Sequence, residues 1–383
     1  MPVQPLRYAR SRFCRSPQSL MAIIWLAIWL HPAPADATDQ DLDPSMFSFN
    51  GFGTLGVVHS NDNQADFVSN AFQSKGAGFT NSWSGTPDTK LGIQINAALT
   101  DRLSAVVQVM SQYQYDGTFR PDLEWGNVKY LLTPDLSIRA GRIAIPTFMD
   151  SDSLTLGYAL PFVRMPLEIF ANLPVTHSDG VDGSYRTHFG DVTNTVQAFL
   201  GGFNLKLADQ GEYDAHGMYG IADTVEYGAT TLHFSYQTLR YDLSFLGLVL
   251  NHVSQQIATI GVSYDPGKWF VSSELMRAPD EAFGVFYGAD VYVGRRVAKV
   301  TPYVGYARAG MTRVGSLGFT PFINQDTTSF GVRWDLWKNI DFKAQLDHTV
   351  RHGGFNEFYI NQQPGFQERG TDEVFTLLVD FVF

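Results

Sequence analysis

The sequence predicts an all-β fold, a transmembrane antiparallel β-barrel of about sixteen strands. Three observations lead to this prediction. The last residues alternate between apolar and polar, pairs of strands joined by short polar turns recur along the chain, and no apolar run of spanning length follows residue 37. A barrel strand turns one face to lipid and the other to the lumen, so its membrane character shows only at every second residue. A helical membrane protein is excluded.

The C-terminal segment carries the alternation to the last residue. The polar residues Thr376 and Asp380 fall between apolar ones, although Val374, Leu378 and Val382 weaken the contrast. The apolar set is Phe375, Leu377, Val379, Phe381 and Phe383. An ordinary buried last strand is the alternative, but such a strand has no need to stop on an aromatic residue. The pattern therefore favours a strand with one lipid-facing side.

The N-terminal segment has the pattern of an export signal. Four arginines precede an apolar core at residues 20–30, and Ala35-Asp36-Ala37 supplies an A-x-A cleavage site. An uncleaved anchor is the alternative, but the core is shorter than the roughly 20 residues that a spanning helix needs. We therefore expect residues 1–37 to be a cleaved secretory signal peptide and residues 38–383 to form the barrel.

The composition excludes several classes of function. The formal net charge is −11, and loss of the predicted signal would make the chain more acidic because that segment holds four arginines and one aspartate. Proteins that bind nucleic acid are typically basic, so we expect no nucleic-acid partner. Cys14 is the only cysteine and lies in the predicted signal, so disulfide and thiol chemistry are not expected. The pattern gives no reason to expect a cofactor.

Strand pairs are recognised by alternation on both sides of a polar turn. In 330–336 and 340–346, charged residues such as Arg333, Asp341 and Lys343 alternate strictly with apolar ones. Charges at this spacing are costly in a soluble core but natural on a wet lumen wall. The expected strands are 47–58, 91–99, 103–109, 124–132, 136–145, 179–187, 192–202, 217–226, 229–241, 257–264, 269–277, 283–294, 299–309, 330–336, 340–346 and 375–383.

The connections between these strands alternate in length. Short turns are expected near 101, 134, 189, 227, 266, 296 and 338, and longer segments at 59–88, 146–178, 203–216, 310–326 and 351–371. Bacterial barrels have short periplasmic turns and longer external loops, so both termini are expected in the periplasm.

These features together resemble the Gram-negative outer-membrane porins. The resemblance rests on the first strand at 47–53, the hairpin at 99–103, the segment 139–142 and the terminal Phe383, in that order. It implies a sixteen-stranded barrel that is usually a homotrimer, in contact with outer-membrane lipid and lipopolysaccharide. A strand that ends on a terminal Phe also resembles the assembly signal of such barrels, which implies the barrel-assembly machinery as a partner through Phe381 and Phe383.

In porins the third external loop folds into the barrel and narrows it, and here that loop is expected at 146–178. The loop side of the constriction is expected to hold Asp150, Asp152, Arg164 and Glu168. The wall side is expected to hold Arg139, Arg142, Arg308, Arg333 and Lys343. Facing charges of opposite sign would select solutes by charge and size. Arg142 has the opposite parity to Arg139 and needs a bulge to reach the lumen. The alternative is an ordinary, solvated external loop.

The predicted function is a water-filled outer-membrane channel for passive diffusion of ions and small hydrophilic solutes, and no enzyme activity is expected. Three alternatives remain: a substrate-selective channel, a barrel enzyme and a structural or adhesive barrel. The nearest enzyme candidate is His177 beside Ser178 and Asp179, although adjacent strand residues point to opposite faces. No metal site is expected, since His348 and His352 lack an H-E-x-x-H context.

Overall fold

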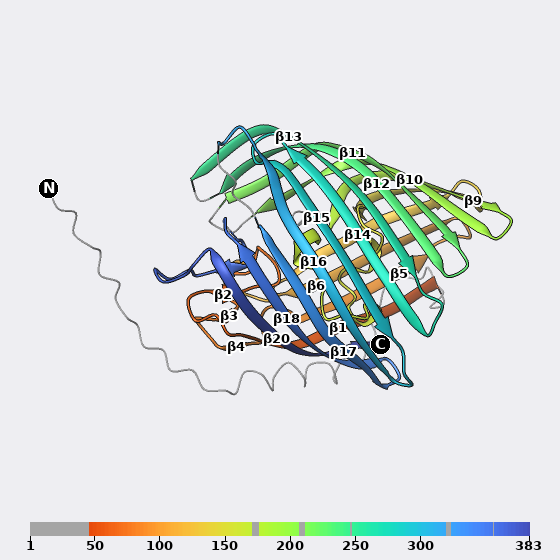
Figure 1. The fold of residues 1–383 in the computed structure, drawn as a ribbon. Coiled ribbons are helices and arrows are strands. Elements are labelled where there is room, and N and C mark those ends of the chain that lie inside the picture. Colours follow the sequence, from red (N-terminus) through yellow and green to blue (C-terminus); the bar gives the residue numbers. More distant parts are fainter. Residues whose placement is uncertain (1–45, 171–175, 207–210, 246, 319–322, 355) are drawn as a thin grey trace, which may run out of the picture. The chain divides into compact units, whose positions relative to one another are not determined.

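Sixteen long strands close into an antiparallel barrel (Figure 1). The computed structural model describes residues 46–170, 176–206, 211–245, 247–318, 323–354 and 356–383, all within one compact unit, Pro44–Phe383. The predicted signal peptide, 1–37, lies outside the described residues. Among the residues described, no helix is long and apolar enough to cross a membrane.

Each barrel strand pairs with its neighbours in antiparallel register, and the last strand pairs with the first. The prediction of an all-β, sixteen-stranded antiparallel barrel is therefore confirmed. In order around the barrel the strands are β1 (Phe47–Ser60), β5 (Lys90–Ala98), β6 (Leu103–Gln112), β7 (Pro121–Leu131), β8 (Leu136–Ala144), β9 (His177–Phe189), β10 (Val192–Lys206), β11 (Gly211–Tyr227), β12 (Thr230–Phe245), β13 (Leu248–Tyr264), β14 (Trp269–Asp280), β15 (Gly284–Arg295), β16 (Val300–Val314), β17 (Gln325–Trp337), β18 (Ile340–His352) and β20 (Arg369–Val382).

Strand β1 closes the barrel by pairing along its first half with β5 and along its second half with β20. Two glycines of β1 lie under aromatic rings of the chain's end. A Cβ atom on Gly51 would come within 2.2 Å of the Phe383 ring, and one on Gly53 within 2.4 Å of the Phe381 ring. The glycines of the first strand therefore make room for the two terminal phenylalanines.

Side chains alternate between the two faces of the strands as the sequence predicts. In β18 the residues Asp341, Lys343 and Asp347 point into the barrel and are buried, while Phe342 and Leu346 point outward. The inward polar side chains do not simply line water, because many of them contact a connection that enters the lumen.

One end of the barrel has only short connections, of two to four residues, and we call it the short-turn end. The opposite end, the loop end, carries the longer connections. The prediction of a long loop at 203–216 is wrong at both ends of that range, since residues 203–206 belong to β10 and residues 211–216 belong to β11. Register shifts at Gly201/Phe203 and His216/Tyr219 interrupt the two-residue period there. These irregularities hide the strands from a search for alternation.

Short elements occupy the loops. Strands β2 (Asp66–Phe67), β3 (Ala77–Gly78) and β19 (Tyr359–Ile360) form a small three-stranded sheet, and β4 (Trp83–Ser84) pairs with β1. The connection between β8 and β9 holds the 3-10 turns η2 (Ser151–Ser153) and η3 (Gly157–Ala159) and the single helical turn α2 (Leu167–Phe170).

Candidate functional site

The connection from β8 to β9, residues 145–176, enters the barrel and contacts its inner wall on several sides; we call it the inward loop. It was predicted at 146–178, and its fold into the barrel is confirmed for 145–170, the part that the structure describes. Its first residues bind the inner faces of β12, β13 and β14, and its later residues bind those of β16, β17, β18 and β20. The loop therefore crosses the lumen.

The first anchor lies at the start of the loop. The Thr147 carbonyl accepts hydrogen bonds from Ser235 Oγ at 2.8 Å and Thr259 Oγ1 at 2.5 Å. The Met149 backbone N–H donates to Glu274 Oε1 at 2.7 Å. Backbone groups of a loop need partners when they leave water, and here the barrel wall supplies them.

The second anchor is a pair of wall cations that bind backbone carbonyls of the loop. Lys343 Nζ donates to the Gly157 carbonyl at 2.7 Å, and Arg333 Nη1 donates to the carbonyls of Tyr158 at 2.7 Å and Leu160 at 2.9 Å. The Lys343 side chain is fully buried, and Asp380 Oδ2 lies 2.7 Å from its ammonium. A buried charge requires such a partner.

The third anchor is Arg164, whose guanidinium joins the loop to three other parts of the chain. It lies 2.7 Å from Asp88, in the connection before β5, and 2.8 Å from Asp347 on β18. Arg164 Nη2 also donates to Thr376 Oγ1 of β20 at 2.5 Å. The Arg164 side chain is only 10% exposed and those of Asp88 and Asp347 are 7% and 8% exposed, so this ion pair is screened little by solvent.

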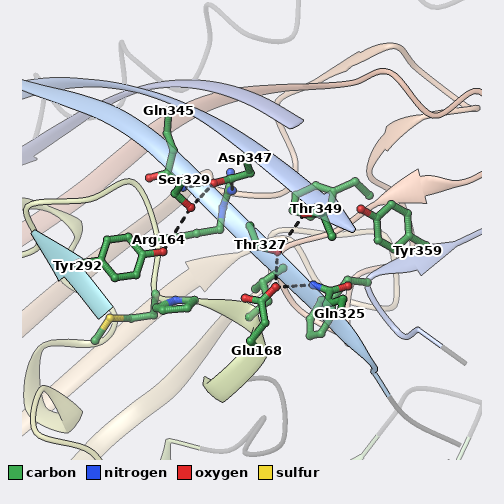
Figure 2. A pocket seen from close by; sticks show the side chains of 15 residues that line it. Arg164, Glu168, Tyr292, Gln325, Thr327, Ser329, Gln345, Asp347, Thr349 and Tyr359 are labelled. Atoms are coloured by element: carbon green, nitrogen blue, oxygen red, sulfur yellow. Dashed lines mark hydrogen bonds and ion pairs between the residues drawn. The ribbon is translucent and has the colours of Figure 1, made fainter. Parts of the chain in front are cut away.

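The fourth anchor is Glu168 on α2 (Figure 2). Its carboxylate accepts a hydrogen bond from Gln325 Nε2 at 2.6 Å and another from the Thr327 hydroxyl. Burial raises the pKa of Glu168 above its usual value, because the charged form loses its water. Behind Glu168 and Arg164 only a cavity of about 20 Å³ remains, roughly enough for a water molecule.

Apolar packing complements these polar anchors. Ile145, Phe148 and Ile169 of the loop belong to one buried cluster with inner-wall residues such as Ile257 and Met276. Leu160 and Phe162 form a second cluster against the inner faces of β14, β15 and β16, and the Phe162 and Tyr292 rings lie 4.6 Å apart. Burying each large side chain is worth about 1.5–3 kcal/mol. This part of the lumen is therefore filled by the loop.

The inner wall of β7, β8 and β9 carries basic residues that face the lumen. Arg139 lies 2.5 Å from Asp182, which also accepts a hydrogen bond from Gln197. Lys129 lies directly opposite Arg139 in the register of β7 and β8. Asp152, exposed on the inward loop, is near enough to Arg139 for electrostatic interaction. A carboxylate of the loop thus lies within reach of a basic wall.

Asp150 is half-buried next to Asp152, and burial raises the pKa of its carboxyl. The four predicted loop residues therefore have different surroundings. Arg164 and Glu168 are anchors against the wall, Asp152 interacts with Arg139, and Asp150 lies near the carboxyl groups of Glu274 on β14 and Asp290 on β15.

Two of the predicted wall residues lie on the other face of the barrel. Arg142 pairs with Asp179 at 2.7 Å, and it shares its parity with Ile138, an exposed apolar residue of the outward face. Arg308 is 64% exposed, shares its parity with Tyr306 and pairs with Asp326 at 3.4 Å. No bulge shifts Arg142 inward, because β8 and β9 keep one continuous register. These two residues are therefore not part of the lumen wall.

The structure adds site residues that the sequence reasoning missed. Asp88, Asp347 and Asp380 are the acidic partners of Arg164 and Lys343. Alternation with Lys343 places Asp347 on the inner wall but does not show which residue it contacts. Asp88 lies in a connection without a period, so no comparable signal marks it.

Comparisons with known proteins identify the fold. No family model matches the chain, and no curated protein matches its sequence. Among solved structures, the anion-selective porin from Comamonas acidovorans has a TM-score of 0.56 at 13% identity, covering 88% of this chain and 99% of that one. OmpF of Salmonella typhi in complex with daunomycin has a TM-score of 0.56 at 12% identity, covering 88% and 97%. The outer membrane channel DcaP of Acinetobacter baumannii has a TM-score of 0.56 at 11% identity, covering 88% and 97%.

The closed sixteen-stranded barrel and these similarities together define a porin-like fold. At such low identities the likeness concerns the fold alone.

Proposed function

We propose that the protein is an outer-membrane channel for passive diffusion of ions and small hydrophilic solutes, exported by the signal at residues 1–37. The observation that carries the proposal is the inward loop, which crosses the lumen and is held by Arg333, Lys343, Arg164 and Glu168. A loop that is fixed across the lumen sets the size of the largest solute that passes, and passage requires no covalent chemistry.

The proposed constriction lies between the inward loop and the wall of β7–β9. Asp152 supplies negative charge on the loop side, and Arg139 and Lys129 supply positive charge on the wall side. Opposite charges across a narrow water-filled passage create a transverse field, which orients dipolar solutes and distinguishes ions by sign. Arg333 and Lys343 act differently, because their charges are used to hold the loop.

The outward face of the barrel supports a position in the outer membrane. Exposed aromatic side chains flank the short turns, as in the aromatic girdles of bacterial barrels. They include Phe189, Tyr227, Tyr264, Trp269 and Trp337. We place the loop end outside the cell and the short-turn end in the periplasm, with lipid and lipopolysaccharide around the barrel and a homotrimer as the assembly. Phe381 and Phe383, seated on Gly53 and Gly51, are proposed as the signal for the barrel-assembly machinery.

The arrangement of side chains at the nearest catalytic candidate also favours a non-enzymatic function. Ser178 points inward and its hydroxyl donates to the Gly202 carbonyl at 3.3 Å, whereas His177 and Asp179 lie on the outward face. The serine and the histidine therefore do not form a nucleophile–base pair.

The test is solute entry into liposomes that contain the refolded protein. Swelling rates with a series of sugars of rising size should fall steeply at a definite size. In a second experiment, a salt gradient across a planar bilayer that contains the protein should give a steady reversal potential. Correctly folded protein that passes neither sugars nor ions would refute the diffusion channel.

A further inference from the structure

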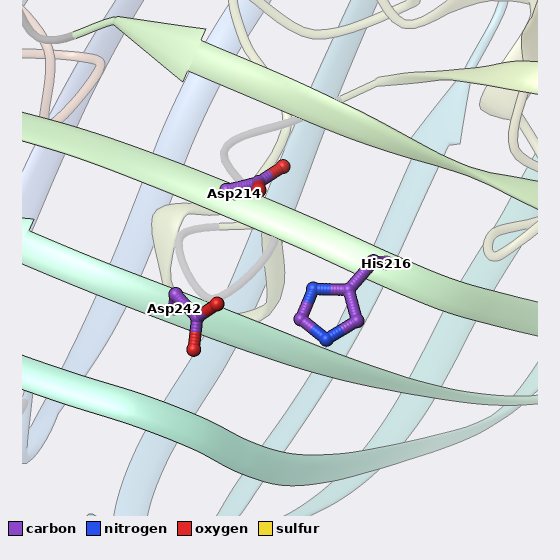
Figure 3. A group of neighbouring side chains, drawn as sticks. All are labelled: Asp214, His216 and Asp242. Atoms are coloured by element: carbon purple, nitrogen blue, oxygen red, sulfur yellow. The ribbon is translucent and has the colours of Figure 1, made fainter.

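A group of carboxylate and imidazole side chains lies away from the inward loop, near the loop end of β11 and β12. Asp214 and His216 of β11 and Asp242 of β12 each offer a ligand atom, and these atoms lie within 4.8 Å of one another (Figure 3). All three side chains are half-buried. None of them takes part in the anchors of the inward loop.

The group lies on the outward face of the barrel. The inward residues here are Ala215 and Tyr241, which are paired across the two strands and buried. Asp214 and Asp242, their neighbours in sequence, are therefore outward and lie directly opposite each other in the register. Two like charges at directly paired positions destabilise a sheet. A cation held between them would turn this repulsion into attraction.

Two imidazoles lie beside register irregularities at this point. The register of β11 shifts just after His216. The register of β13 shifts opposite Asp242, where His252 adopts a φ of 57°. The His252 backbone N–H donates to Asp242 Oδ1 at 2.6 Å, and its ring Nδ1 lies 3.5 Å from the same oxygen. The rings of His216 and His252 lie 6.1 Å apart. Bulges of this kind re-aim side chains.

We propose that Asp214, His216 and Asp242 bind a divalent transition-metal ion of the zinc class, with His252 as the fourth donor. Zinc takes imidazole nitrogen and carboxylate oxygen in four-coordinate sites, at about 2.0–2.2 Å. Calcium and magnesium prefer sites made only of oxygen. The donor set of two imidazoles and two carboxylates therefore matches zinc.

The bound ion would join three neighbouring strands. Asp214 and His216 belong to β11, Asp242 to β12 and His252 to β13. Toward the short-turn end, the exposed side chains of Tyr219 and Ile221 continue the outward apolar face of β11. The site thus lies on the loop side of that apolar band, where aqueous ions reach it, and the His252 side chain is 78% exposed. The ion would pin the outer ends of these strands together.

The direct test is a zinc titration of the refolded full barrel by isothermal titration calorimetry, with the metal ion alone as the probe. The expected result is one equivalent of zinc per chain that is not displaced by excess magnesium. In Asp242→Asn and in His216→Gln the affinity should fall by more than about tenfold, the scale on which even supporting partners of metal ligands act.

The matched control is His348→Ala. It removes the imidazole of another imidazole–carboxylate pair, His348 and Glu373, which also lies on the outward face. This variant should bind zinc as the unaltered protein does. Zinc should also raise the unfolding temperature of the unaltered protein and of His348→Ala but not of Asp242→Asn. If Asp242→Asn does not refold, His216→Gln decides the outcome. Absence of stoichiometric zinc binding, or equal binding by His216→Gln, would overturn the proposal.

Discussion

Arg164 Nη1 lies 2.8 Å from Asp347 Oδ2, and this contact joins the inward loop to the inner wall of β18. Both side chains are almost completely buried, so the pair has no surrounding water to replace either partner. Removal of one member leaves the other as an uncompensated buried charge. The position of the loop in the lumen depends on this pairing together with Asp88.

The first prediction concerns this anchor. Arg164→Met should lower the free energy of unfolding by about 3–5 kcal/mol, the usual cost of breaking a buried ion pair. The same substitution should release part of the inward loop and make single-channel current larger and noisier. Denaturant unfolding and planar-bilayer recording measure the two effects.

The control for Arg164 is Arg142→Met. Arg142 is also paired with an aspartate, but it lies on the outward face, and its hydrogen bonds to described residues go to Asp179 and the Leu123 carbonyl. Conductance should be unchanged in this variant. Equal current changes in the two variants would show that Arg164 has no special role in holding the loop.

The second prediction concerns charge selectivity. Asp152→Asn removes an exposed carboxylate of the inward loop that interacts with Arg139. The reversal potential in a salt gradient should move toward anion preference, with little change in stability because the side chain is exposed. Asp116→Asn, in the connection between β6 and β7, is the control and should leave the potential unaltered. A reversal potential that Asp152→Asn does not move would place the constriction elsewhere.

The third prediction concerns pH. Burial raises the pKa of Glu168 above the ordinary value of 4.5. Stability that comes from neutral Glu168 is therefore fully present below pH 4.5 and is lost as the pH rises through the raised pKa. The difference in unfolding temperature between Glu168→Gln and the unaltered protein should be near zero at pH 4.5 and should grow in favour of Glu168→Gln at pH 8.

Hydrogen exchange of the α2 backbone amides locates this effect, since protection at pH 8 should be greater in Glu168→Gln. A pH-independent difference between the two proteins would mean that folding does not raise the pKa of Glu168.

The fourth prediction concerns the closure of the barrel. Gly53→Ala would place a Cβ atom 2.4 Å from the Phe381 ring, so the ring must move. The expected cost is about 1–3 kcal/mol, as for other overpacked sites. Gly183→Ala is a suitable control, because the nearest atom to its Cβ is the Ser137 carbonyl oxygen at 3.9 Å. If both variants unfold at the same denaturant concentration, the packing of Phe381 on Gly53 contributes nothing measurable.

Much of the barrel could be predicted from alternation, because a two-residue period fixes both the strand and its faces. It located all sixteen strands and set Arg333 and Lys343 on the inner wall. It failed where bulges interrupt the period, as in the outer parts of β10 and β11. Alternation did not fail at Arg308. Its parity with the exposed Tyr306 already indicates the outward face, so the expectation that Arg308 lines the lumen disagrees with the pattern itself.

Contacts between residues that lie far apart in the chain could not be predicted from the sequence. Asp88 and Arg164 are joined by an ion pair although 76 positions separate them, and nothing local marks either as the partner of the other. The same is true of Asp214 and Asp242, which the register of β11 and β12 places directly opposite each other. Contacts of this kind follow from the closed topology of the barrel.

The most direct test of the proposed constriction is single-channel conductance after shortening the inward loop. Residues 150–165 would be replaced by a short Gly-Ser linker, and the refolded variant would be recorded beside the unaltered protein in a planar bilayer. A larger, steady conductance in the shortened variant is the predicted result, because the crossing segment would be gone. Equal conductance in the two folded proteins would contradict the assignment of this loop as the element that limits the channel.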